Sequence, residues 1–244
     1  MKTTAFLFAI AILFIFAAPQ LRADDYTYTT SGGTFNNSFS AMMDMTRTWN
    51  TNLWNAQSAV NQVDRQTARI VQQQNGTVAP PPQAPAPPPL PQFPITATDF
   101  IPIGPRILPD QIVNTTPNLT GEQKDGLKQL SNQYLDAFES QARKNNVANA
   151  LAFLVGVSLQ TISGKEPPDV LVDQLITGFN NGMANTAQFE VMNQHDKQVL
   201  YESFVISGGM VAFLHQQKDA QMQKQARDMA RAVVSHFLGI QVPN

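Results

Sequence analysis

Apolar residues recur at intervals of three and four positions in five successive segments of the C-terminal half of the chain, residues 118–244. This spacing predicts amphipathic helices that each bury one face. Between the segments lie residues suited to starting or stopping a helix: Thr120 with Gln123, Asn145 and Asn146, Gly164, Asp169, Asn180 to Gly182, Asn193 with Asp196, the break at Lys218 and Asp219, and Gly239. A short turn is expected around Phe189. The pattern therefore predicts an all-α fold with a five-helix C-terminal bundle.

A longer apolar stripe runs through residues 38–76, where no Pro or Gly occurs before Gly76. Its heptad-like spacing predicts one long amphipathic helix of about 55 Å. A helix cannot bury such a stripe alone, so we expect it to pack on its own chain or on a second copy, with a foreign partner as the alternative. The expected interaction stripe consists of Met42, Met45, Trp49, Leu53, Val60 and Val63.

Proline dominates the segment between these two regions, residues 77–117. Thirteen of the 17 prolines lie between Pro80 and Pro117, which predicts a semi-rigid polyproline II spacer of about 50 Å over residues 79–95. A proline-rich docking ligand is the functional alternative. From Phe100 to Val113 the segment is more apolar than a free linker needs, and we expect an extended strap on the surface of the following domain.

The first 23 residues have the pattern of a secretory signal peptide. Lys2 precedes an unbroken apolar run from Ala5 to Ala18, and the expected cleavage follows Ala23. The run would rise about 21 Å as a helix, which is short of the roughly 30 Å core of a bilayer, so we expect no stable membrane span after cleavage. Residues 24–37 contain few apolar residues and are expected to form a disordered arm. The localisation expected is periplasmic or secreted.

Composition excludes several classes of protein. The chain contains no cysteine, so thiol catalysis, Cys-ligated metals and an N-terminal lipid anchor on cysteine are ruled out. Removal of the signal peptide leaves 14 basic and 18 acidic residues. A formal charge of −4 gives no basic footprint for nucleic acid, and we expect none to bind.

Two adjacent glycines inside an expected helix, Gly208 and Gly209, are the most unusual local feature. They destabilise a helix by about 2 kcal/mol relative to two alanines and therefore need a structural reason. Close approach of a neighbouring helix is the favoured explanation, with Gly156 as the expected counterpart on the second helix. A ligand cleft over the exposed backbone is the alternative.

No catalytic, metal-binding or cofactor-binding set is identified. Motif searches find no His-Glu-x-x-His, Gly-x-Ser-x-Gly or Ser-x-x-Lys. His215 and His236 are expected at the far ends of antiparallel helices, where they complement the helix dipoles. Asp136, Glu139 and Arg143 are expected to form a solvated face with an i,i+4 ion pair.

Several short sequences in the C-terminal half resemble a family of exported bacterial proteins with a helical domain of unknown function. They are Tyr134 to Glu139, Ala150 to Leu154, Leu200 to Glu202 leading into Ser207 to Gly209, and Phe237 to Gly239. The resemblance covers about half of the chain. It implies a bacterial envelope setting and supplies no catalytic residue.

These observations favour an exported bacterial envelope protein that acts as a non-enzymatic interaction or scaffolding module. Its partner would be another protein or a second copy, bound through the N-terminal helix. The alternative is a hydrolase acting on envelope polymer or peptide through carboxylates such as Glu139, Glu202 or Asp173. A third hypothesis, a membrane-active toxin, would require leakage from liposomes.

Overall fold

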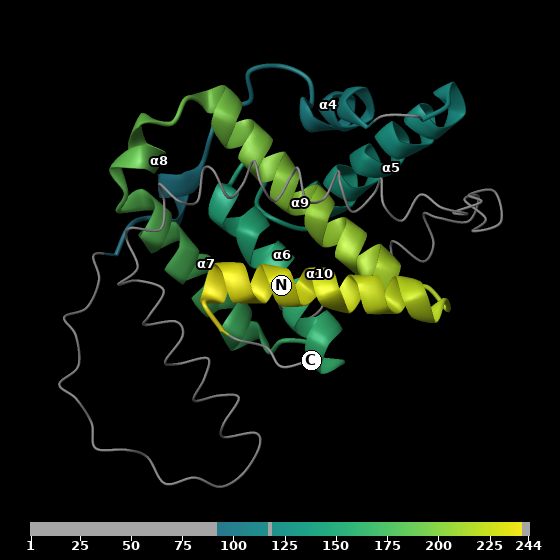
Figure 1. Cartoon of the computed structure of the whole chain (residues 1–244). Coiled ribbons are helices and arrows are strands. Elements are labelled where there is room, and N and C mark those ends of the chain that lie inside the picture. Colours follow the sequence, from purple (N-terminus) through teal and green to yellow (C-terminus); the bar gives the residue numbers. More distant parts are fainter. Residues whose placement is uncertain (1–91, 117–118, 241–244) are drawn as a thin grey trace, which may run out of the picture.

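The computed structural model describes residues 92–116 and 119–240, and this part of the chain is all-helical (Figure 1). It contains seven α-helices and one short 3-10 helix, and none of the described residues forms a β-strand. In chain order the elements are η2 (Ile95–Thr98), α4 (Leu108–Thr115), α5 (Gly121–Glu139), α6 (Val147–Ser163), α7 (Asp169–Ala184), α8 (Ala187–Val191), α9 (Gln194–Gln216) and α10 (Ala220–Leu238). The expected signal peptide, arm and interaction stripe lie outside the described residues, as do residues 79–91 of the expected polyproline spacer; Ile95, its last residue, begins η2.

Most of the expected helix boundaries are confirmed, because short-range side-chain bonds define them. The Thr120 hydroxyl accepts from Gln123 N, and the Gln123 side chain accepts from Thr120 N, which completes the capping box of α5. Asn146, Asn193 and Asp219 each accept the backbone N–H three residues later and so cap α6, α9 and α10. Gly164 and Gly239 end α6 and α10 with φ of 67° and 68°, a conformation that favours glycine.

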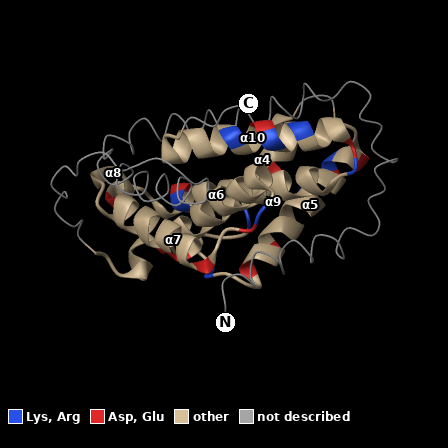
Figure 2. Cartoon of the chain, turned by 90° about the horizontal axis from the view of Figure 1, so that it is seen from below, with Lys and Arg blue, Asp and Glu red and all other residues tan. Residues whose placement is uncertain are grey.

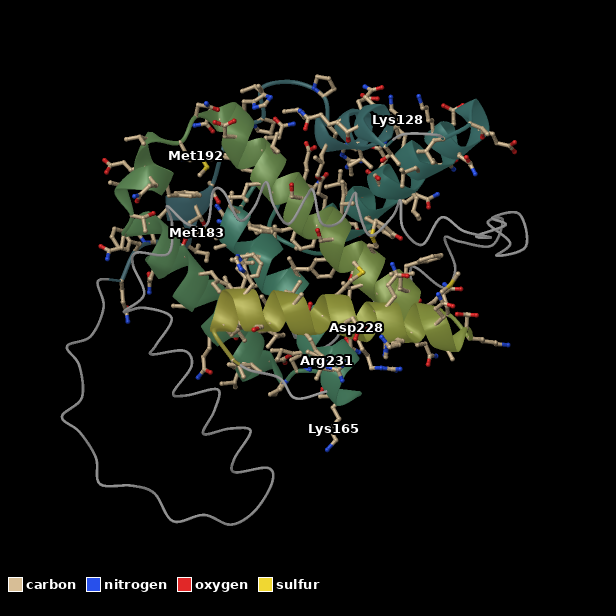
Figure 3. The ribbon with its side chains drawn as sticks, viewed as in Figure 1. Lys128, Lys165, Met183, Met192, Asp228 and Arg231 are labelled. Carbon is tan, nitrogen blue, oxygen red and sulfur yellow. The ribbon has the colours of Figure 1, made fainter. Side chains whose placement is uncertain are left out.

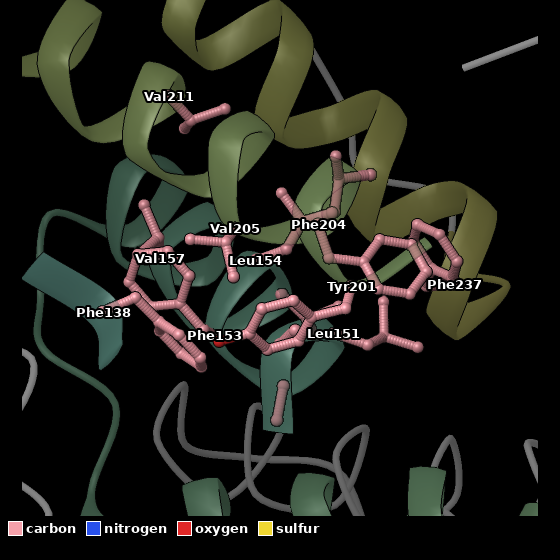
Figure 4. Packing of buried hydrophobic residues seen from close by; sticks show 14 of the residues in the cluster. Phe138, Leu151, Phe153, Leu154, Val157, Tyr201, Phe204, Val205, Val211 and Phe237 are labelled. Carbon is pink, nitrogen blue, oxygen red and sulfur yellow. The ribbon is translucent and has the colours of Figure 1, made fainter. Parts of the chain in front are cut away.

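Helix α6 forms the centre of the bundle. Its sequence consists largely of apolar and small residues, and it is buried along most of its length. Helices α7, α9 and α10 pack around it (Figure 1). Aromatic side chains pack between the helices, with Phe138 of α5 against Phe153 of α6 and Phe204 of α9 against Phe237 of α10 (Figure 4). Close packing of this kind supplies most of the stability of a cysteine-free domain.

Three expectations differ from the structure. Helix α7 ends at Ala184, so Asn180 to Gly182, the expected stop, lie within it. Residues 108–115, expected to be part of an extended strap, form helix α4 and bury Leu108 and Val113. Pro109 lies in the first turn of α4, where a missing N–H does no harm, so this proline is compatible with a helix. Helix α7 is preceded by Pro168 as its N-cap, and Asp169, the expected cap, lies in its first turn. The helical domain thus includes residues upstream of the expected boundary at 118.

The glycine pair lies where α9 approaches two other helices. A Cβ atom built on Gly208 would stand 2.6 Å from Phe153 Cε1 and 3.3 Å from Leu154 Cα, both on α6. One built on Gly209 would stand 2.4 Å from Tyr134 Cγ on α5. Gly156, the expected counterpart, is buried in α6, one turn beyond Phe153. Gly208 and Gly209 therefore let neighbouring positions of α9 lie close to both α6 and α5.

Replacing Gly209 by alanine is expected to lower the free energy of unfolding by about 1–3 kcal/mol, because overpacking outweighs the better helix propensity of alanine. The new Cβ would also stand 2.9 Å from Tyr134 Cβ, an atom that cannot swing away. Urea denaturation followed by far-UV circular dichroism measures the change. Gly121→Ala is the matched control, since nothing lies within 4 Å of a Cβ at Gly121. Equal stability of the two variants would contradict the role of Gly209 in the close approach of α9 to α5.

Candidate functional site

Three polar side chains on α9 hold the segment that leads into α4. We call residues 93–108 the strap; it runs from η2 past the N-terminal end of α9 to α4 (Figure 1). Gln194 Oε1 accepts from Ile101 N at 2.8 Å, and Gln198 Oε1 accepts from Ile103 N at 3.1 Å. Gln198 Nε2 donates to Pro105 O at 3.1 Å. With Glu202, these residues recur every four positions, so one face of α9 carries all three.

Glu202 binds the start of α4. Its Oε2 accepts from Ile107 N at 2.9 Å and from Leu108 N at 2.7 Å, and its Oε1 accepts from Gln198 Nε2 at 2.9 Å. The Glu202 residue is only 2% exposed. A carboxylate at a helix N-terminus satisfies N–H groups that have no partner in the helix and interacts favourably with its dipole. Glu202 therefore acts as the cap that α4 lacks in its own sequence.

Amide side chains of α7 and the α6 cap hold the other end of the strap. Asn181 Oδ1 accepts from Phe93 N at 2.9 Å, while Asn180 Oδ1 accepts from Thr98 Oγ1 at 3.0 Å. Asn146 Nδ2 donates to Ile95 O and to Asp99 Oδ1, each at 2.8 Å. Asn180 is 1% exposed and Asn146 is fully buried. Side chains thus bind several backbone groups of the strap, in addition to the backbone bond from Phe100 N to Asn145 O at 2.9 Å.

Two arginines add ion pairs to these amide contacts. Arg106, on the strap, donates to Asp136 at 2.7 Å and to Glu139 at 3.1 Å, both on α5. Arg143 donates to both carboxylate oxygens of Asp99. Burial alone would raise the pKa of Asp99, but the hydrogen bonds from Arg143 and Asn146 outweigh it and hold that pKa below its ordinary value.

Phe100 anchors the strap in the core. Its ring lies 5.2 Å from that of Tyr201, which in turn lies 5.9 Å from Phe138. The Tyr201 hydroxyl donates to Glu139 Oε1 at 3.4 Å. Burial, reinforced by the Glu139 charge, raises the pKa of Tyr201 far above its usual value, so the phenol stays protonated. Tyr201 is thus a hydrogen-bond donor at this position and not a base.

The outer side of the strap is apolar and exposed. We call residues 101–105, Ile-Pro-Ile-Gly-Pro, the apolar loop; all five are exposed. Ile101 is 74% exposed and Ile103 is 57% exposed. The N–H groups of both isoleucines bind α9, so their backbone is fixed while their side chains face solvent. The polar contacts of α9 therefore hold an apolar segment at the surface of the domain.

The structure does not bring the suggested carboxylates together as a catalytic pair. Glu202 caps α4, Glu139 receives Arg106 and Tyr201, and Asp173 is exposed on α7. The expected i,i+4 pair of Glu139 with Arg143 is wrong, because Glu139 binds Arg106 and Arg143 binds Asp99. Among the described residues, no group of three His, Asp or Glu side chains could hold a metal ion.

Charges elsewhere on the described surface are largely balanced. On α10, Asp228 pairs with Lys224 at 2.7 Å and with Arg231 at 3.2 Å. Figure 2 shows basic and acidic residues interspersed along this helix, and Figure 3 shows Asp228 close to Arg231. Within residues 92–116 and 119–240, no helix combines the length and apolar character needed to cross a bilayer.

Sequence reasoning missed most residues that hold the strap: Asp99, Arg106, Asn146 as a strap ligand, Asn180, Asn181, Gln194 and Gln198. The sequence contained one signal that pointed to these residues. Gln194, Gln198 and Glu202 recur every four residues on a helix that is otherwise mostly buried. Such a row of long polar side chains indicates a polar partner, although it does not identify the strap as that partner.

Together, the fold and the site define an all-helical domain whose own N-terminal strap is bound by side chains of three helices. The chain belongs to a family of unknown function, DUF6683, whose family model matches residues 1–243. The match therefore spans both the described domain and the segments that precede it. Comparisons with curated proteins and with solved structures found no match.

Glu202→Ala is expected to lower the free energy of unfolding by about 1–3 kcal/mol, because the N–H groups of Ile107 and Leu108 lose their buried acceptor. The loss should be local to α4 and the strap, so hydrogen exchange at residues 103–110 should accelerate more than exchange in α6. Asp173→Asn, on the exposed face of α7, is the matched control and should change neither measurement. Uniform acceleration throughout the domain would contradict a local capping role.

Asp99→Asn is expected to reduce stability near neutral pH and to flatten its dependence on acid. Because the folded state lowers the pKa of Asp99, its contribution is fully present above the ordinary carboxyl pKa and is lost as the pH falls through the lower folded value. The difference between the wild-type chain and the variant should therefore shrink with acidification. Urea denaturation at a series of pH values measures it, and a difference that stays constant or grows would contradict the assignment.

Proposed function

We propose that this chain is an exported bacterial envelope protein whose helical domain serves as a non-enzymatic interaction or scaffolding module. The expected signal peptide of residues 1–23 supports export, and the expected helix of residues 38–76 supplies an interaction stripe. One family model matches residues 1–243, so the segments with these features and the described domain fall within a single family pattern.

The observation that carries this proposal is that the carboxylates of Glu202 and Glu139 are bound by other groups of the domain. Glu202 is the most buried carboxylate described, and all its bonds go to the strap and to Gln198. Glu139 is bound by Arg106 and Tyr201. A hydrolase needs a carboxylate free to reach substrate or water. These two acids instead hold the strap, so their roles favour a binding domain over the carboxylate-dependent hydrolase.

The apolar loop gives the second support. Its backbone is held by Gln194 and Gln198, and its isoleucine side chains remain exposed. Ordered polar contacts beneath a solvent-facing apolar segment are what a preformed docking element requires, since little conformational entropy is then lost on binding.

The proposal predicts a mature protein that begins at Asp24, appears outside the cytoplasm and assembles as its concentration rises. Leu53→Asp or Trp49→Asp should weaken assembly at least tenfold, because a charge would be placed on the apolar stripe. Mass spectrometry of fractionated cells and sedimentation velocity measure the two properties.

Asn55→Asp is the matched control, since residue 55 lies about 200° around the expected helix from residue 53. It adds the same charge away from the stripe and should leave assembly unchanged. Retention of the full chain in the cytoplasm would contradict export. Assembly that is unaffected by Leu53→Asp and Trp49→Asp would contradict the interaction role of the stripe.

A further inference from the structure

The strap carries most of the exposed apolar side chains of the described domain. Among residues 92–116 and 119–240, the exposed large apolar residues are Ile95, Ile101, Ile103, Val170 and Val191. Three of these five lie on the strap, within nine residues of one another. The strap also follows directly on residues 1–91, which contain the expected interaction stripe. An exposed apolar surface and an expected apolar stripe therefore occur in neighbouring segments of one chain.

The size of the apolar loop favours a tethered occupant over a free one. Burying the exposed parts of two isoleucine side chains strengthens association by roughly 10²- to 10³-fold. A free partner held by this contact alone would bind with a Kd near or above about 1 mM. A segment tethered by a linker whose length matches the span has an effective concentration that is also in the millimolar range. The contact is thus strong enough to be populated within one chain and too weak to recruit a protein at micromolar concentration.

The lengths of the intervening segments allow the stripe to return to the loop. In the expected polyproline II conformation, residues 79–91 would extend about 40 Å, a length similar to the diameter of a domain of 150 residues. The expected helix covers the same 40 Å over the 27 residues from Gly76 back to Trp49. A reversal at Asn75 to Val78 would therefore bring Trp49 and Leu53 back to the domain where the strap begins.

We propose that the N-terminal stripe docks in cis on the apolar loop, with Trp49 and Leu53 against Ile101 and Ile103, and that this contact limits self-association of the stripe. The inference rests on the proposed interaction role of the N-terminal helix. In this arrangement the side-chain amides of Gln194 and Gln198 hold the apolar loop in the conformation that binds the stripe. Assembly requires release of the stripe from the loop.

Tryptophan fluorescence tests the contact directly, because the only two tryptophans of the chain, Trp49 and Trp54, lie in residues 38–76. In the dilute mature protein, the double substitution Ile101→Ser with Ile103→Ser should shift the emission to longer wavelength. The same variant should assemble at several-fold lower concentration, because the stripe is no longer occupied. Val170→Ser with Val191→Ser is the matched control, since these valines are 66% and 82% exposed, and should change neither measurement.

Disulfide trapping separates a contact within one chain from a contact between copies, and the absence of cysteine gives a clean background. Trp49→Cys with Ile103→Cys should form a bond within the monomer under mild oxidation, and Trp49→Cys with Val191→Cys should not. Dimers linked only between chains, or no bond at all, would overturn docking in cis. An unshifted emission in the isoleucine double variant would overturn it as well. Either result leaves the Leu53→Asp assembly test intact, so the two proposals fail separately.

Discussion

Helix α9 can lie against both α5 and α6 because two of its positions carry no side chain. At Gly208 and Gly209 even a single Cβ would overlap rings of Phe153 and Tyr134. The packing energy that this close approach provides must exceed the helix propensity that the glycines give up, about 1 kcal/mol each. Buried aromatic side chains on both sides supply that energy. The rest of the domain depends on this crossing, because α9 also carries the residues that hold the strap.

The crossing fixes the position of the N-terminal half of α9, and this position decides where the strap lies. Glu202 lies about 1.7 turns before Gly208, so a small displacement of α9 at the two glycines would move the Glu202 carboxylate away from Ile107 N and Leu108 N. A buried carboxylate without donors is strongly destabilising. A change in the core packing of α9 would therefore be transmitted through this helix to the polar contacts of the strap.

Local signals in the sequence were sufficient to predict the main helices, whereas the strap site required contacts between distant residues. The capping residues Thr120, Asn193 and Gly239 act on groups within a few positions, so their effect can be read from the sequence. Glu202 acts on backbone groups 94 and 95 positions away. From sequence alone, the row of Gln198 and Glu202 does not show which segment of the chain these side chains bind. For the same reason α4, which takes its cap from α9, was expected to be extended.

The roles of the acids also bear on the choice between binding and catalysis. For Glu202 to act as a general acid or base, it would have to exchange a proton with substrate and release the N–H groups of Ile107 and Leu108. Release would uncap α4 and loosen the strap at the residues that precede it. Catalysis by Glu202 and an ordered strap therefore exclude each other in this fold. The most buried carboxylate of the described domain is thus committed to holding the start of α4, and through Gln198 it is linked to the segment that carries Ile103.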